Sequence, residues 1–307
     1  MLHLKAPFGH IRNNLKKDNF WGAWCPFKSG NRFTSLSLEE TLMGGQSFDW
    51  HEVSRLHWRG RIERNILECR WHNQAAKWRC KQNQKLPIDL IEEYFCLGKD
   101  YEASLDELPW RSDSVLGKCM DKLDGLRILR QPFDQTLFFF ILSSAKSIPQ
   151  IQMTGEAVFQ KYGDELMKGV FSFPGWKRLA TIPENELRAL KLGYRARYIS
   201  QTAKFIEERP GWLDSIPERN YTDAKNELLR LPGVGEKIAD CTLLFGANFL
   251  EAFPIDTWIE KSLEKRYSLQ GWNTSQKIHF ARVHFGKFAG LAQQFLFSGE
   301  RLGILEE

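Results

Sequence analysis

The chain has 307 residues, of which 42% are hydrophobic and 26% charged, and its mean hydropathy is −0.42. This composition is typical of a globular protein and excludes disordered and fibrous classes. The longest uninterrupted aliphatic or aromatic run, Leu137–Leu142, has six residues, whereas a membrane helix needs about 20, so we expect no membrane span. The formal net charge of +5 permits a polyanionic partner without requiring one.

The cysteines form no Cys-x-x-Cys pair and no Cys/His cluster at metal-ligand spacing. They are Cys25, Cys69, Cys80, Cys96, Cys119 and Cys241. We therefore expect reduced thiols and no bound metal. The N-terminal stretch with Lys5, Arg12, Lys16 and Lys17 has no apolar segment behind it, so it does not read as a secretory signal, and a cytoplasmic location is expected.

The N-terminal part of the chain contains short segments in which apolar and polar residues alternate. Residues 67–71 and 77–81 show this pattern on either side of a turn at 73–76, which predicts a β-hairpin with one apolar face. Residues 48–50 and 56–58 add two shorter segments of the same kind. The pattern predicts an antiparallel sheet whose other face is solvated.

From Phe133 onward the apolar period changes to that of a helix. Helices are predicted at 134–147, 149–162, 184–192, 195–209, 221–231, 235–248, 256–267 and 275–297. Proline and glycine residues separate them. The fold class is therefore α+β, with an antiparallel sheet domain at residues 1–120 followed by a larger all-α domain at residues 121–307.

The most informative segment lies between two predicted amphipathic helices and reads Leu231-Pro232-Gly233-Val234-Gly235-Glu236-Lys237. Proline ends the first helix, and the glycines allow a tight turn with positive φ and little side chain in the way. The backbone N–H groups of Gly233, Val234 and Gly235, with the start of the next helix, suit a phosphate oxygen, bound directly or through a monovalent cation. An ordinary helix–helix connection is the alternative.

Two residues near this turn could carry acid–base or covalent chemistry. Lys237 opens a helix, where the positive end of the macrodipole disfavours a further cation and favours the neutral amine that acts as a nucleophile. Asp256, in the segment Pro254-Ile255-Asp256, opens another helix. Its carboxylate could be only a helix cap, or it could serve acid–base chemistry at a sugar carbon.

These motifs resemble the helix-hairpin-helix, Gly/Pro-rich and aspartate DNA glycosylase superfamily, and within it the eukaryotic-type 8-oxoguanine DNA glycosylase/AP lyase. The resemblance spans about Leu36 to Leu302 and rests on separated blocks in matching order. Besides the hairpin, they are Gly45-Gln46-Ser47-Phe48, Arg127 to Gln131, Leu192 to Tyr198, and Ala292-Gln293 with Leu296-Phe297-Ser298. The family's N-terminal domain has a TBP-like fold, which is the expectation here for the sheet domain.

The resemblance implies a catalytic pair, in which Lys237 attacks C1′ of an extruded nucleotide and forms a Schiff base while Asp256 handles protons. It also implies a base pocket made of Gly45, Cys241, Gln293 and Phe297, in which the Gly45 carbonyl accepts a hydrogen bond from N7–H of 8-oxoguanine. Core packing is the alternative for Cys241 and Phe297. Helical i, i+4 spacing pairs Lys237 with Cys241 and Gln293 with Phe297, which places each pair on one helix face.

The resemblance further implies that Tyr194 wedges into the gap left by the base and that Arg195 reads the orphaned cytosine. The chain departs from the family elsewhere. Ala145-Lys146-Ser147 stands where the family has an asparagine run, Gln150 where it has a second cytosine-reading arginine, and Trp258 where it usually has histidine. Lys146 and Gln150 remain candidates for a single hydrogen bond to the opposite base.

The implied partner is double-stranded DNA that contains an oxidised purine, and the expected protein is a monomer without cofactor, in the nucleoid of a prokaryote or the nucleus of a eukaryote. A related glycosylase for thymine glycol usually carries a four-cysteine cluster, and one for alkylpurines lacks the hairpin lysine. A non-catalytic DNA-binding module would need neither Lys237 nor Asp256. These three alternatives stay open at the level of sequence.

Overall fold

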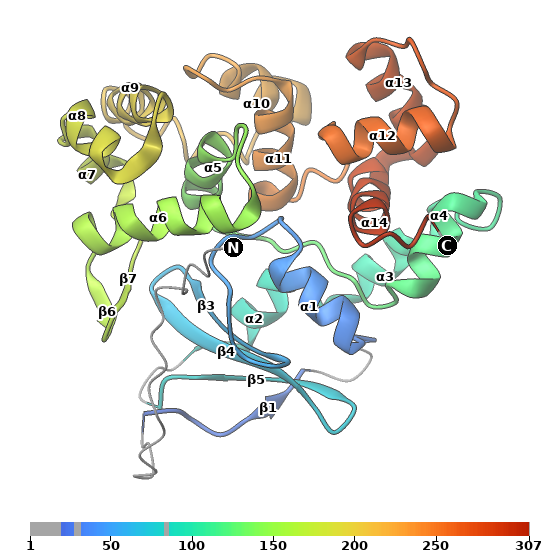
Figure 1. Cartoon of the computed structure of the whole chain (residues 1–307), viewed down its shortest axis with the longest axis horizontal. Helices are drawn as coiled ribbons and strands as arrows, with labels where there is room; N and C mark the ends of the chain where they lie inside the picture. The colour runs from blue at the N-terminus through green and yellow to red at the C-terminus, as the bar shows by residue number, and fades with distance from the viewer. Residues whose placement is uncertain (1–19, 28–31, 83–85, 307) are drawn as a thin grey trace, which may run out of the picture.

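The computed structural model describes residues 20–27, 32–82 and 86–306 (Figure 1). The charged stretch from Lys5 to Lys17 lies outside the described residues. Among the residues described, no helix has both the length and the apolar character needed to cross a membrane.

A five-stranded antiparallel sheet forms in the order β1-β5-β4-β3-β2 (Figure 1). Its strands are β1 (Cys25–Pro26), β2 (His51–Ser54), β3 (His57–Ile62), β4 (Asn65–His72) and β5 (Ala75–Cys80). The predicted hairpin is confirmed as β4 and β5, with a shorter turn than expected. Asn73 and Gln74 alone connect the strands, with φ of 51° and 57°, and two successive positive φ values suit the twist of paired strands.

The face of the sheet away from the apolar cluster is not simply solvated, so that prediction is wrong. Glu68 is only 1% exposed and accepts hydrogen bonds from Arg59 and Arg79. Both guanidinium groups lie over the ring of Trp21, at 5.2 and 5.0 Å from its centroid. A carboxylate can be buried in this way because its charge and lone pairs are matched by two arginines.

Helices that the alternating pattern did not predict also lie in the N-terminal half. They are α1 (Ser35–Met43), α2 (Ile88–Tyr94), α3 (Lys99–Asp106) and α4 (Ser114–Lys122). Local signals mark two of their starts, since Thr34 and Ser37 form a capping box at α1 and Asp113 caps α4. Helix α1 buries Leu38 and Leu42 in the cluster on the inner face of the sheet.

The C-terminal part is almost entirely helical, which confirms the α+β class. Its helices are α5 (Phe133–Leu142), α6 (Ile148–Tyr162), α7 (Gly175–Ala180), α8 (Glu184–Leu187), α9 (Arg195–Glu207), α10 (Tyr221–Leu228), α11 (Glu236–Ala247), α12 (Thr257–Arg266), α13 (Thr274–Phe285) and α14 (Ala289–Arg301). The short strands β6 (Glu165–Met167) and β7 (Val170–Phe171) form a separate hairpin.

Three predicted helices differ from the observed ones. The helix predicted at 275–297 is two helices, because the chain breaks at Gly286, where φ is +70° and a short 3-10 turn follows. The helix predicted at 134–147 ends at Leu142, and Ala145 beyond it has φ +50°. The second half of 184–192 is a π-helical segment, Arg188–Leu192, that is kinked at Lys191, where φ is 64°.

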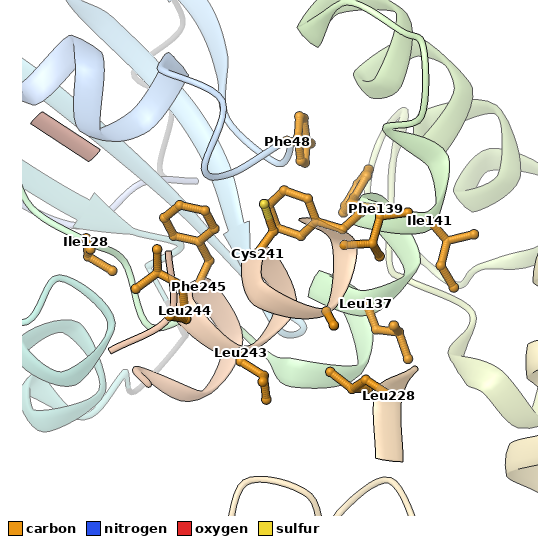
Figure 2. Close-up of a cluster of buried hydrophobic side chains, with 14 of the residues drawn as sticks. Phe48, Ile128, Leu137, Phe139, Ile141, Leu228, Cys241, Leu243, Leu244 and Phe245 are labelled. Atoms are coloured by element: carbon orange, nitrogen blue, oxygen red, sulfur yellow. The ribbon is translucent and has the colours of Figure 1, made fainter. Parts of the chain in front are cut away.

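The large hydrophobic cluster centres on α5 and α11. Every side chain from Leu137 to Leu142 is at most 3% exposed, so α5 is buried all round, as a central helix must be. Figure 2 shows Phe48 from the loop after α1, Phe139 from α5 and Cys241 from α11 in this cluster. The Phe48 ring packs against the rings of Phe139 and Phe140, which fixes the loop after α1 against α5.

Candidate active site

One cavity of about 570 Å³ brings together residues from both halves of the chain. Its lining includes all the side chains or backbone positions predicted as catalytic or base-binding, namely Gly45, Lys237, Cys241, Asp256, Gln293 and Phe297. They come from the loop after α1, from α11, from the start of α12 and from α14. The tertiary fold therefore assembles what the sequence separates by up to 252 positions (297 − 45).

The turn between α10 and α11 requires glycine at Gly233 for two reasons. Its φ is +78°, and a Cβ built there would lie 2.3 Å from the ring of Tyr198. Gly233 and Gly235 are exposed, and Gly235 caps α11 without any side-chain hydrogen bond. The first turn of α11 is thus left open for an acceptor from outside the protein.

Val234, between these glycines, has a different role from the one expected of a phosphate-binding residue. Its side chain is 6% exposed and belongs to the large cluster, and its N–H donates to the Leu231 carbonyl at 3.1 Å. Neither the side chain nor the N–H group of Val234 is therefore available to bind a phosphate. The candidate phosphate-binding surface consists of the two glycines and the start of α11.

A buried polar network that the sequence did not single out braces the hairpin. Asp240, 1% exposed on α11, accepts hydrogen bonds from Tyr221 at 2.6 Å and from Lys225 at 3.0 Å, both on α10. Lys225 also pairs with Glu236 at 2.5 Å. Leaving one charge of such a buried pair without its partner costs about 3–5 kcal/mol, so the network locks the angle between the two helices.

Lys237 lies in the first turn of α11 and is half-buried in the cavity. Its Nζ is 3.4 Å from Oγ of Ser143 and 5.3 Å from the centroid of the Phe140 ring. Both neighbours belong to α5 or the residue that ends it. The hydroxyl and the ring face hold the amine over the cavity, where it can reach a bound atom.

Asp256 is the N-cap of α12, and its Oδ1 accepts from the N–H groups of Trp258 and Ile259 at 3.0 and 2.9 Å. Burial raises the pKa of the carboxyl group above its ordinary value, and the Ile259 N–H and the Lys237 ammonium partly oppose that rise. The cap interpretation is thus correct, and the same carboxylate also faces the cavity and interacts electrostatically with Lys237.

The loop that carries Gly45 is clamped by its neighbour. Gln46 donates from Nε2 to the Arg127 carbonyl and accepts at Oε1 from the Leu129 N–H, each at 2.8 Å. Gly45 itself has φ +93°, and a Cβ there would lie 2.9 Å from Ile148. A side chain at Gly45 would therefore strain the backbone and enter the cavity wall.

The remaining pocket residues offer two apolar surfaces and one free acceptor. Burial raises the pKa of the Cys241 thiol to about 12, so the thiol stays neutral. Phe297 is half-buried and lies 3.7 Å from the position of a Cβ on Gly45. Gln293 is 4% exposed, and within the described part of the chain its Oε1 has no hydrogen-bond partner. An unpaired buried acceptor costs about 1–3 kcal/mol, which a ligand donor would recover.

Tyr194 and Arg195 lie at the start of α9, and only the first is open to solvent. Tyr194 is 49% exposed. Arg195 is 6% exposed, and its guanidinium donates to the carbonyls of Ser144 and Leu192 and lies 4.3 Å from the centroid of the Tyr194 ring. In this state Arg195 supports the segment after α5.

Gln150 and Lys146 are likewise held by bonds within the protein. Gln150 is exposed at the start of α6, where its Oε1 accepts from the Ser147 N–H at 3.0 Å to complete a capping box. Lys146 lines the cavity and donates from Nζ to Oγ1 of Thr154 at 2.5 Å. Burial lowers the pKa of Lys146, and Arg195 adds to the effect.

Two protein-family models match the sequence. Residues 31–137 match the 8-oxoguanine DNA glycosylase N-terminal domain, and residues 140–285 match the HhH-GPD superfamily of base excision DNA repair proteins. The boundary between the two matched regions, at residues 137–140, falls within the buried helix α5.

Individual relatives extend over nearly the whole chain. The N-glycosylase/DNA lyase OGG1 of Arabidopsis thaliana is 30% identical over 301 residues, covering 90% of this chain and 80% of its own. The N-glycosylase/DNA lyase of Saccharomyces cerevisiae is 28% identical, covering 87% and 84%.

A solved structure gives the same result. The Clostridium acetobutylicum 8-oxoguanine glycosylase/lyase, in complex with double-stranded DNA containing cytosine opposite to 8-oxoG, aligns with a TM-score of 0.80 and 29% identity. The alignment covers 86% of this chain and 91% of that one. The chain therefore belongs to the 8-oxoguanine DNA glycosylase family, within the HhH-GPD superfamily of base excision DNA repair proteins.

Proposed function

We propose that this protein excises 8-oxoguanine from duplex DNA and then nicks the abasic strand by β-elimination through a Schiff base on Lys237. The observation that carries the proposal is that the amine of Lys237 and the carboxylate of Asp256 face one cavity whose other walls supply hydrogen-bonding groups and apolar faces for a base. A phosphate clamp would need neither the amine nor the carboxylate.

The cavity suits an extruded purine. A base inside the duplex stack cannot be reached, so extrusion is required at a cost of a few kcal/mol. Cys241 and Phe297 would contact the two faces of the base, and the unpartnered Oε1 of Gln293 would accept from its Watson–Crick edge. The Gly45 carbonyl would accept from N7–H, which guanine lacks, and guanine would instead bring two acceptors together.

The chemistry follows from the catalytic pair. The neutral amine of Lys237 attacks C1′, the bond from C1′ to the base breaks, and the base leaves with the electron pair and takes up a proton. The C1′–O4′ bond then breaks, O4′ takes up a proton from water, and the lysine nitrogen forms an iminium with C1′ whose positive charge the nearby carboxylate of Asp256 stabilises. Loss of a C2′ proton then expels the 3′ phosphate, and hydrolysis of the imine frees the lysine.

The hairpin would anchor the strand without reading its sequence. The exposed backbone of Gly233 and Gly235 and the start of α11, which has no side-chain cap, support a phosphate contact. A monovalent cation at this turn would have the backbone carbonyls of Pro232, Gly233 and Val234 as its candidate ligands. We propose a monomer that needs no other cofactor and acts where the genome is, in a nucleoid or a nucleus.

Borohydride trapping on a panel of single-lesion duplexes tests the proposed function. We expect a covalent adduct with 8-oxoguanine, and a far weaker one with thymine glycol or undamaged DNA. A strong adduct with thymine glycol alone would assign another lesion range. Binding to every duplex without any adduct would identify a non-catalytic module.

The preference for cytosine opposite the lesion should be weaker than is usual in the family. Each bidentate contact to a base is worth about 1–3 kcal/mol of discrimination, and Ala145 and Gln150 stand where two of the family's readers would be. Arg195 remains, and it must first give up its bonds to Ser144 and Leu192. Single-turnover excision rates opposite all four bases measure the preference.

The variant Gln150→Arg should sharpen this preference by roughly 10-fold, with little effect on cleavage at a preformed abasic site. It also removes the Gln150 side chain that completes the capping box of α6, so Gln150→Ala is the matched control: it loses the same hydrogen bond and gains no guanidinium. If both variants changed selectivity alike, the effect would come from α6 and not from base reading.

A further inference from the structure

Trp258 occupies a position at the cavity that neither the catalytic pair nor the base pocket uses. It lies two residues after Asp256, in the first turn of α12, and its backbone N–H donates to the Asp256 carboxylate at 3.0 Å. Its side chain lines the cavity and is 37% exposed. A large apolar ring that lines the cavity and is also partly exposed to solvent therefore follows the carboxylate closely in the chain.

The cations on this side of the cavity are already paired. The ammonium of Lys261 lies 5.5 Å from the centroid of the Trp258 ring, and it pairs with Glu300 at 3.3 Å and Glu306 at 2.8 Å. Arg301, which also lines the cavity, pairs with Glu40. The wall around Trp258 therefore presents an aromatic surface and not an uncompensated positive charge.

We infer that Trp258 packs its indole ring against the deoxyribose of the extruded nucleotide and shields the pair Lys237–Asp256 from water. The inference rests on the proposed function only in requiring an extruded nucleotide. The base would lie deeper, between Cys241 and Phe297, and C1′ must lie within reach of Lys237. The sugar would then lie between the buried base and the solvent, which is where a ring that lines the cavity and is 37% exposed can contact it.

The contact has properties that separate it from a phosphate contact. Packing of an aromatic ring on a nucleotide contributes affinity that does not depend on counterion release, whereas each phosphate contact adds to the salt dependence of binding. The contact also exists only when a nucleotide is extruded. Trp258 should therefore matter for DNA with an extruded site and not for intact duplex.

The test is equilibrium binding to a duplex with a tetrahydrofuran abasic analogue, which keeps the sugar ring and carries no base. We expect Trp258→Ala to weaken this binding by about 10-fold, with an unchanged slope of log K against log salt and unchanged binding to undamaged duplex. Trp258→Phe, which keeps an aromatic ring, should stay within about 3-fold of the wild type.

Trp272→Ala is the matched control, because Trp272 is 43% exposed and is not among the residues that line the cavity. Three results with Trp258→Ala would each overturn the inference. They are unchanged binding to the abasic duplex, a slope of log K against log salt that is lowered by about one, and an equal loss of affinity for undamaged duplex. The readout needs no excision, so a protein that failed to remove 8-oxoguanine could still show the effect of Trp258, and the two failures remain distinguishable.

Discussion

Lys237→Gln should abolish covalent trapping by borohydride and lower strand cleavage by at least about 10³-fold, because an amide nitrogen cannot replace the attacking amine of the proposed nucleophile. Binding to lesion-containing duplex should persist, since glutamine has similar length and can still bond to Ser143. The melting temperature should change little, because the side chain is only half-buried and makes one long hydrogen bond, of 3.4 Å.

The cavity itself provides the control for this experiment. Lys146 is a second lysine in its lining, and burial lowers its pKa, so it is the natural competitor for the role of nucleophile. Lys146→Gln should keep trapping at the level of the wild type. Loss of trapping in this variant with full trapping in Lys237→Gln would reverse the assignment of the two lysines.

Asp256→Asn should slow base excision by about 10²–10⁴-fold while leaving the fold stable. The asparagine oxygen can still accept from the N–H groups of Trp258 and Ile259, so the cap of α12 is kept. Asp256→Ala removes cap and carboxylate together and should in addition cost about 1 kcal/mol of unfolding free energy. Single-turnover rates and melting temperatures of the two variants separate the roles.

The pH dependence gives an independent readout of the same carboxylate. Burial raises the pKa of Asp256, so the charged form is lost at a higher pH than for an ordinary aspartate. The excision rate of the wild type should therefore be maximal above this raised pKa and should fall as the pH drops through it. Asp256→Asn should lack that acid limb. A normal rate and an intact acid limb in the variant would leave the carboxylate with a structural role alone.

The sequence by itself determined the class of the fold and the identity of the hairpin. A tight turn between helices needs a residue that tolerates positive φ, and this requirement is local, so Gly233, with φ +78°, is visible in the sequence. The cap at Asp256 is local in the same way. Periodicity likewise located most C-terminal helices within a few residues.

Periodicity was less informative where burial did not follow it. The sheet's outer face looks polar in sequence, yet Glu68 is buried there because Arg59 and Arg79 come from neighbouring strands to compensate it. The continuous apolar pattern at 275–297 conceals the break at Gly286. The pattern of polar and apolar residues shows neither the ion pairs that bury Glu68 nor the backbone angle that breaks the helix at Gly286.

Only the tertiary structure decided which groups surround the reactive amine. Ser143 and Phe140 lie about a hundred positions before Lys237, and nothing in their local sequence marks them as its neighbours. The same holds for the bonds that occupy Arg195 and for the buried Asp240 that braces the hairpin. Local backbone requirements can be read residue by residue, but a cavity depends on the packing of distant segments, and its chemistry is fixed only when those segments meet.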